Sequence, residues 1–328
     1  MIDAQIMTQT SNGPLVTFAI FAYNQEKYIR EAVDSAFSQT YQPLEIILSD
    51  DSSTDGTFSI IQEMAAAYTG HHFVKILKSE QNLGLAGHIN KIISASNGEI
   101  ITWGAGDDIA LPNRTELFVS KMLENPEYVG VHSDVEEINI EGEFIRYRRH
   151  SGEQADTRLD RVISYGQSVI TQSHAFKKCV FDTFGPFRCD LTQEGIAMAF
   201  RESALGKVAF INEPLTKYRI GCGVSTYSGS ELSRIKLSEP IKYTNWYLSA
   251  FRQMIDDSKR LPYPFSKEKY DILYKNIRFY SNIMKINKGE KFLFPLLDNF
   301  IMFPSDLRSL RAAMRRCAPN WLYKRFMP

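Results

Sequence analysis

The stretch VTFAIFAYNQEKYIREAVDSAFSQTYQPLEIILSDDSSTDGT, residues Val16 to Thr57, decides the fold class of this chain. With the preceding leucine it opens on a β-branched and aromatic run, Leu15 to Ala22, that is typical of a buried strand. Apolar residues then recur at helical spacing between Glu26 and Phe37, and Leu44 to Leu48 is predicted as a second buried strand. A strand, a helix and a strand in this order predict a crossover unit of a parallel sheet.

The same alternation continues beyond this stretch. The spacing predicts helices over Phe58 to Tyr68 and Leu85 to Ser96, and strands over Phe73 to Leu77 and Glu99 to Trp103. We therefore expect an α/β fold with a mostly parallel, Rossmann-like sheet flanked by helices. In such sheets ligands bind beyond the carboxyl ends of the strands, so the polar segments after the strands are the candidate sites.

The rest of the chain divides by pattern. Residues 139–160 are polar and charge-dense and predict a surface hairpin or loop, and Lys207 to Ile211 reads as a further strand. After about Ser238 the pattern becomes mainly helical. We expect a tail at 1–13, the α/β domain at 14–235 and a helical region at 236–328.

Composition excludes several classes of protein. With 328 residues and 44% apolar residues the chain is globular, and one large or two unequal domains are expected. Its 38 basic and 38 acidic residues cancel, which argues against nucleic acid as a partner. The four cysteines lack metal-ligand spacing and are expected to be free thiols. No secretory signal or run of about 18 apolar residues is found, so a cytoplasmic location is expected.

An acidic cluster follows the second predicted strand directly. Asp50, Asp51 and Asp55 place three carboxylates within six residues. One interpretation is that they cap the next helix, with Gly56 making the turn. Capping needs only one or two such residues, and neighbouring carboxylates repel unless a ligand meets them, so a binding role is the other interpretation.

A second acidic cluster, Gly106-Asp107-Asp108, follows the fourth predicted strand. Asp108 could cap a helix that begins near Pro112. Paired carboxylates at a strand end are also a ligand set for a hard divalent cation. Mg²⁺ binds through one or two carboxylates and completes its shell with substrate phosphate oxygens.

Taken together, in this order and spacing, the two clusters resemble the family 2 glycosyltransferases, which use a GT-A type nucleotide-sugar-binding fold. The matching stretches are Val16 to Thr57, NLGLAGHINKIISASNGEIITWGAGDDIALPNR (82–114), FGPFR (184–188) and LGKVAFINEPLTKYRIG (205–221). The resemblance covers about Leu15 to Ser225, some two-thirds of the chain.

The resemblance implies roles for individual residues. It implies that Ala22, Tyr23 and Asn24 line the nucleotide pocket, that Asp50 and Asp51 hold the base and ribose, that Asn82 and Gly84 approach the nucleotide, that Asp107 meets the diphosphate, and that Asp108 is the direct ligand of Mg²⁺ or Mn²⁺. These roles agree with physical chemistry, because a divalent cation stabilises the charge that develops on a departing nucleoside diphosphate.

The general base departs from the family pattern. Inverting transfer needs a base for the acceptor hydroxyl, which in the family is usually the Asp of a Glu-Asp pair followed by an Arg. Counting back from Arg201 puts Glu194 on the Glu and Gly195 on the Asp. Glu194 could act as the base from a shifted loop, a one-residue change of register could place it on the base position, or the chain could be weak or inactive. We take Glu194 as the candidate.

The function implied is an inverting glycosyltransferase that moves a single sugar from a nucleoside diphosphate sugar to an acceptor hydroxyl, in cell-surface polysaccharide or lipid-linked glycan assembly. The QxxRW signature of processive relatives is absent, which favours single additions. The alternative is a nucleotide-sugar-binding protein with weak or no activity, because of Gly195. Nucleotidyl transfer is disfavoured, since FAYNQEK after the first strand is no phosphate-cradling loop. His174 either lines the acceptor site or is a packed or solvated histidine.

The last 28 residues, Ile301 to Pro328, carry six basic residues and one acidic residue, a net charge of +5, so the remaining chain has −5. Leu307 and Leu310 fall on one side of a helical wheel, with Arg308 and Arg311 on the adjacent side. Such a basic amphipathic helix suits a membrane surface, which predicts a peripheral location on the inner face of the cell membrane. Alternatively, its apolar side packs on the domain.

Overall fold

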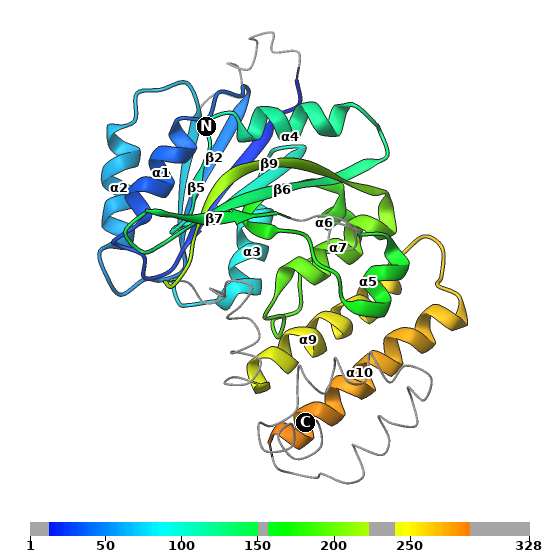
Figure 1. Cartoon of the computed structure of the whole chain (residues 1–328). Coiled ribbons are helices and arrows are strands. Elements are labelled where there is room, and N and C mark those ends of the chain that lie inside the picture. Colours follow the sequence, from blue (N-terminus) through cyan, green and yellow to red (C-terminus); the bar gives the residue numbers. More distant parts are fainter. Residues whose placement is uncertain (1–12, 150–156, 223–239, 289–328) are drawn as a thin grey trace.

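The computed structural model describes residues 13–149, 157–222 and 240–288, and its centre is one curved mixed sheet covered by helices (Figure 1). The strands are β1 (Val16–Ala22), β2 (Leu44–Asp50), β3 (Phe73–Lys78), β4 (Ile100–Ala105), β5 (Ile109–Ala110), β6 (Tyr128–Ile138), β7 (Phe144–Arg148), β8 (His174–Lys177) and β9 (Lys207–Arg219). The helices are α1 (Ile29–Phe37), α2 (Thr57–Ala67), α3 (Gly84–Ala95), α4 (Arg114–Leu123), α5 (Leu159–Tyr165), α6 (Cys179–Phe184), α7 (Glu194–Leu205), α9 (Pro240–Ser258) and α10 (Lys267–Asn287). A short 3₁₀ turn, η2 (Thr171–Ser173), precedes β8.

The sheet has a parallel half and a mixed half. Its strand order is β3-β2-β1-β4-β8-β6-β9-β5, with β7 added to β6. The four strands from β3 to β4 are all parallel, which confirms the predicted crossover units. Beyond them β8 is antiparallel to both of its neighbours, and β6 and β9 pair in parallel. Helices α4 to α7 still separate most of these later strands, but none of these four helices joins two neighbouring parallel strands, so the crossover unit does not recur among them.

Helices cover both faces of the sheet because the parallel strands are apolar on both sides. Val16, Phe18 and Ile20 of β1 face one buried cluster, which includes apolar residues of α1, α2 and α4. Ala19 of the same strand faces the other cluster, to which α3, α5, α6, α7, α9 and α10 contribute. The period of two along β1 therefore divides the interior into two layers, as the sequence predicted.

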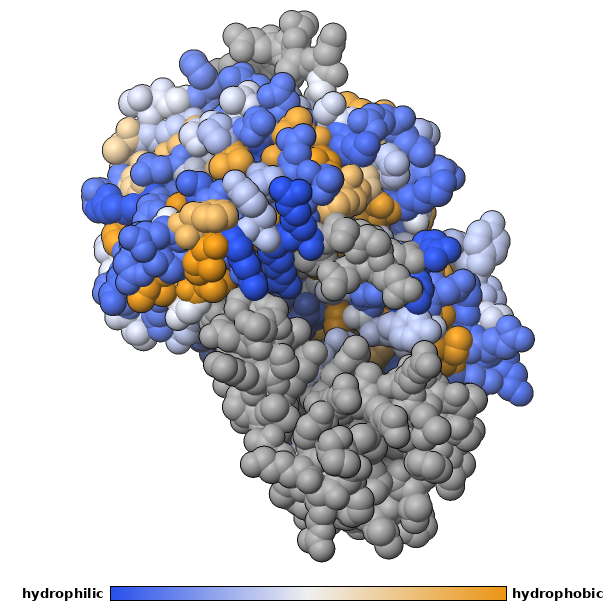
Figure 2. All heavy atoms as spheres, viewed as in Figure 1, coloured by the Kyte–Doolittle hydropathy of each residue, from blue (hydrophilic) through white to orange (hydrophobic). Residues whose placement is uncertain are grey.

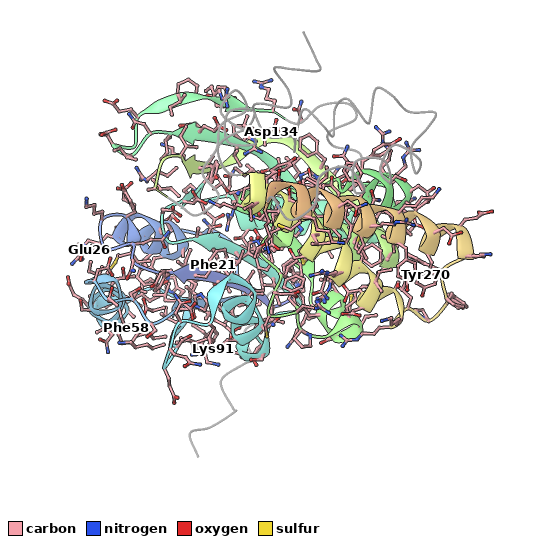
Figure 3. The ribbon with its side chains drawn as sticks, turned by 90° about the horizontal axis from the view of Figure 1, so that it is seen from below. Phe21, Glu26, Phe58, Lys91, Asp134 and Tyr270 are labelled. Atoms are coloured by element: carbon pink, nitrogen blue, oxygen red, sulfur yellow. The ribbon has the colours of Figure 1, made fainter. Side chains whose placement is uncertain are left out.

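The C-terminal helices pack on the domain instead of forming a core of their own. Phe251 and Met254 of α9 are fully buried in the same cluster as Phe200 of α7. A buried ion pair joins the two helices, with Arg201 Nε 2.8 Å from Asp257 Oδ2. Seen from below, Tyr270 of α10 lies at the opposite end of the molecule from Phe58 of α2 (Figure 3). The predicted boundary between 235 and 236 lies outside the described residues.

No described helix has the length and apolar character needed to cross a membrane. On the face shown in Figure 2, hydrophobic residues are interspersed with hydrophilic ones. The basic segment Ile301 to Pro328 lies outside the described residues, so its membrane role stays a prediction.

Candidate functional site

Both acidic clusters lie beside the carboxyl end of β1. The register pairs Ala22 with Asp50 on one side of this strand and Phe21 with Ala105 on the other. The amide of Asp51 donates to the carbonyl of Ala22 at 2.9 Å, and the amide of Gly106 donates to the carbonyl of Phe21 at 3.0 Å. The parallel register thus brings both clusters to one edge of the sheet, as expected from the sequence.

In the first cluster, Asp55 stabilises the local structure, whereas Asp50 and Asp51 lie at the candidate site. Asp55 accepts from the amide of Thr57, the first residue of α2, at 3.0 Å, and from the amide of Glu26 at 3.2 Å. Among the three carboxylates of this cluster, Asp55 is therefore the one that meets the start of α2, whose N-cap residue is Gly56. Asp50 is fully buried and accepts from Ser53 N through Oδ2 at 3.0 Å, while its Oδ1 has no hydrogen-bond partner.

Asp51 organises the third polar segment of the site. Both of its carboxylate oxygens accept from the amide of Leu83, at 3.0 and 3.1 Å. The neighbouring Asn82 accepts from the amide of Gly84 at 2.9 Å. Gly84 begins α3 at φ +69°, a conformation that glycine adopts without strain. The predicted Asn82–Gly84 turn is thus held directly against Asp51.

The loop after β1 is held by hydrogen bonds on one side and is exposed to solvent on the other. Asn24 has φ +52°, and its side-chain oxygen accepts from the amide of Thr54 at 2.8 Å. Tyr23 is 45% exposed. Ala22, Tyr23 and Asn24 therefore lie at the rim of the site, next to Asp50 and Asp51. The structure brings these residues together, and their roles stay predictions.

The second cluster is buried, and its two carboxylates disfavour each other's charge. Asp107 and Asp108 are 5% and 3% exposed. Burial raises the pKa of Asp107, and burial followed by the charge of Asp107 raises the pKa of Asp108 well above its usual range. Asp108 Oδ1 accepts from the backbone amide of Arg219 at 3.0 Å, whereas its buried Oδ2 has no hydrogen-bond partner. Asp108 therefore does not cap a helix.

This pair fits a divalent cation. Among the described residues no group of three or more acidic, histidine or cysteine side chains could hold a metal ion. Mg²⁺ and similar hard cations nevertheless bind to one or two carboxylates when substrate phosphates supply the remaining ligands. The unpartnered Oδ2 of Asp108 is such a ligand atom, and a cation would offset the repulsion between Asp108 and Asp107.

The sequence did not predict that three residues lie beside the acidic pair: the buried Arg114 and Arg219, and Cys222. Arg219 lies in the quoted stretch 205–221, but nothing in the sequence indicates that β9 returns to the second acidic cluster. The Cys222 thiol donates to Asp107 Oδ2 at 3.3 Å, and burial raises the pKa of this thiol to about 12. Arg114 is fully buried, and burial lowers its pKa to about 9 while the charge of Asp108 opposes that shift.

His88 lies beneath the first cluster and was also missed. It is 5% exposed on α3, and its Nε2 is 2.7 Å from Ser49 Oγ. Burial lowers the pKa of His88 to about 4, although the charges of Asp51 and Asp50 oppose this. A neutral imidazole therefore packs behind the residues predicted to bind the base and ribose.

We expect His88 to make the protein less stable in mild acid. The unfolded chain binds a proton on this histidine near pH 6.5, whereas the folded chain binds it only near pH 4. The free energy of unfolding should therefore fall by about 2 kcal/mol as the pH drops from 7 to 5. Urea unfolding of wild type and His88→Gln at both pH values measures this, and the exposed His71 supplies a control, His71→Gln. Equal pH dependence in all three proteins would contradict the assignment.

Glu194 lies on a helix and not at the strand ends that carry the two acidic clusters. It is the first residue of α7, directly after Gln193, whose side-chain oxygen accepts from the amide of Ile196 at 3.0 Å. Its charge reaches His174, where it opposes the burial that lowers the pKa of that histidine to about 3. Within the described residues no hydrogen bond or ion pair joins Glu194 to Asp107 or Asp108. The predicted base and the predicted metal ligands are therefore not in direct contact.

Two other residues considered from the sequence, Arg201 and His174, lie in the interior of the fold. Arg201 is fully buried in its pair with Asp257, and its guanidinium lies 4.3 Å from the ring centroid of Phe187. His174 is fully buried, with Nε2 2.7 Å from Oε1 of the equally buried Glu202. This burial supports interior packing of His174 over a place in the acceptor site.

Comparison with known proteins identifies the family. The model of the Glycosyl transferase family 2 matches residues 17–182. EpsE, a Bacillus subtilis protein named as a glycosyltransferase, is 35% identical over 118 residues, which are 36% of this chain and 42% of EpsE. This chain therefore matches less than half the length of that relative.

Solved structures share the fold at low identity. TarS of S. aureus, solved with UDP, has a TM-score of 0.58 at 14% identity and covers 92% of this chain and 84% of its own. The mannosyltransferase PcManGT of Pyrobaculum calidifontis, solved with GDP-Man and Mn²⁺, has a TM-score of 0.55 at 18% identity, with 92% and 75% covered. These likenesses confirm the predicted GT-A fold. With a family match over half of its residues, the chain belongs to glycosyl transferase family 2.

Proposed function

We propose that the chain is a metal-dependent, inverting glycosyltransferase that moves one sugar from a nucleoside diphosphate donor to an acceptor hydroxyl. The observation that carries this proposal is the meeting of two acidic clusters on either side of the end of β1, with a buried, unpartnered carboxylate oxygen on Asp108. The structures of TarS with UDP and of PcManGT with GDP-Man and Mn²⁺ support a donor of this class.

The donor would bind along the edge formed by β1, β2 and β4. Asp50 and Asp51 would hold the base and ribose, with Asn82 and Gly84 close to the nucleotide. Asp107 and Asp108 would hold Mg²⁺ or Mn²⁺, which when bound neutralises charge on the leaving diphosphate. The burial of both carboxylates strengthens their attraction for a cation, because electrostatic interactions are stronger away from water.

In the transfer step, the acceptor oxygen forms a bond to the anomeric carbon while the bond from that carbon to the diphosphate oxygen breaks. Attack from the face opposite the leaving group inverts the configuration. The hydroxyl proton passes to a carboxylate, for which we propose Glu194, and the nucleoside diphosphate departs. We propose acceptors of the cell-surface polysaccharide or lipid-linked glycan class, and a cytoplasmic enzyme held at the membrane by Ile301 to Pro328.

A second candidate function rests on Gly195, which falls on the usual position of the base when the family motif is counted back from Arg201. The chain would then bind nucleotide sugars with weak or no transfer. Donor binding without turnover on any acceptor would favour this second function.

A panel of nucleotide sugars, scored for thermal stabilisation and for hydrolysis with Mg²⁺, with Mn²⁺ and with EDTA, tests the proposal. We expect at least one nucleoside diphosphate sugar to raise the Tm in the presence of metal, because a ligand that binds only the folded state stabilises it. If no member of the panel binds with any metal, the proposed donor class is wrong.

A further inference from the structure

Arg219 contacts both members of the second acidic pair. It is the last residue of β9 and is 1% exposed. Its backbone amide donates to Asp108 Oδ1 at 3.0 Å, and its side-chain Nε donates to the carbonyl of Asp107 at 3.0 Å. One residue thus fixes the Asp108 carboxylate and the peptide of Asp107, more than a hundred positions earlier in the chain.

The rest of the guanidinium is held by two further segments. Nη1 donates to the carbonyls of Asn139 and Ile140, both at 3.2 Å, in the turn between β6 and β7. Nη2 donates to Glu31 Oε2 of α1 at 2.9 Å, and the group lies 4.7 Å from the ring centroid of Tyr28. These contacts direct the guanidinium at protein partners, so its role differs from direct contact with a diphosphate.

This arrangement counteracts the electrostatic repulsion within the acidic pair. Two buried carboxylates repel each other and favour either protonation or movement towards water. The Arg219 cation opposes that repulsion, and its planar fork, unlike a lysine ammonium, restrains several acceptors in one geometry. The side chain also ties the acidic pair to α1 and to the β6–β7 turn.

We infer that Arg219 is the positioning residue of the Asp107–Asp108 pair: its backbone amide holds the Asp108 carboxylate and its side chain holds the peptide of Asp107, which together keep the pair in the geometry that binds a divalent cation and a nucleoside diphosphate. This inference rests on the proposed function, because the cation is the one that the transfer reaction would need.

Arg219→Lys tests the inference, because it keeps the charge and removes the fork. We expect the affinity for Mn²⁺, measured by calorimetry or electron paramagnetic resonance with a saturating nucleoside diphosphate, to fall about 10- to 100-fold. Binding of the nucleotide without metal should be unchanged. Transfer should recover at high Mn²⁺ concentration, so the variant raises the metal requirement without a matching loss in kcat. A purely structural role would predict no such recovery.

Arg146→Lys is the matched control. Arg146 lies on β7, in the hairpin that Arg219 contacts, and its Nε is 2.7 Å from the buried Glu137. Arg146 has no described contact with the acidic pair, so the Mn²⁺ affinity of the Arg146→Lys variant should equal that of wild type. Glu31→Gln removes the charge of one half-exposed partner of Arg219 and should weaken Mn²⁺ binding about two- to fivefold.

The outcomes separate this inference from the proposed function. If wild type binds no metal with any nucleoside diphosphate, the proposed function and the inference both fail. If wild type binds Mn²⁺ and Arg219→Lys binds it equally well, the inference alone is overturned. Should Arg219→Lys fail to fold, Glu31→Gln decides, and an affinity equal to that of Arg146→Lys overturns the inference.

Discussion

Asp108→Asn is expected to lower kcat/KM for transfer about a thousandfold and to remove the effect of Mn²⁺ on donor binding, because the cation supplies several kcal/mol of charge stabilisation. The substitution is nearly isosteric and can keep an oxygen that accepts from the Arg219 amide. It replaces the buried, unpartnered Oδ2 with an amide nitrogen that cannot bind a cation. Calorimetric titration of the donor with and without Mn²⁺ measures the loss.

The same variant should be more stable than wild type when no metal is present. Burial and the charge of Asp107 both disfavour the charged form of Asp108, so a neutral amide removes repulsion from the folded state. A higher Tm together with lost Mn²⁺ dependence would mark Asp108 as a site residue whose charge costs stability. Asp34→Asn, at an exposed aspartate of α1, is the control and should change neither quantity. Unchanged donor affinity with Mn²⁺ in Asp108→Asn would refute the metal assignment.

The parallel half of the fold could be predicted from sequence because its determinants are local. A buried parallel strand needs a continuous apolar run, as at Val16–Ala22, and its crossover helix needs 3.6-residue spacing. Carboxylates placed directly after such strands must lie at one edge of the sheet, which is where Asp50 and Asp107 are found. Local pattern also left an ambiguity that only contacts resolved, since Asp55, and neither Asp50 nor Asp51, meets the start of α2.

The second half of the site depends on pairing between distant segments, which local pattern does not encode. β9 reaches the acidic pair because it runs parallel to β6 and antiparallel to β5, and this pairing has two shifts of register near Asp134. A one-residue slip would turn Arg219 to the other face of the sheet. Arg201, whose spacing resembles a family motif, forms a buried ion pair with Asp257, and local pattern does not predict this partner either.

Glu194→Gln is the second large effect that we expect. Loss of a general base lowers kcat about 10²- to 10⁴-fold, because the acceptor proton then has no positioned carboxylate to receive it. Donor affinity should be unchanged, since Glu194 has no described contact with the acidic clusters beside β1. Steady-state transfer and calorimetric donor binding separate the two quantities. Glu213→Gln, at an exposed glutamate of β9, is the matched control. Transfer at the wild-type rate by Glu194→Gln would show that another group is the base.

Gly195→Asp distinguishes a chain in which Glu194 acts as the base from a chain that lacks a normal base. A Cβ at position 195 would lie 3.0 Å from the carbonyl oxygen of Val169 and 3.0 Å from the side-chain nitrogen of Gln193, so an aspartate fits only if these neighbours move by a few tenths of an ångström. If Glu194 is the base, this crowding brings no benefit, and Gly195→Asp should transfer no faster than wild type. A large gain in rate from Gly195→Asp, retained in the double variant with Glu194→Gln, would instead show that the native chain lacks a normal base. The nucleotide-sugar-binding function would then be the better description, because the structure would bind a donor that it turns over poorly.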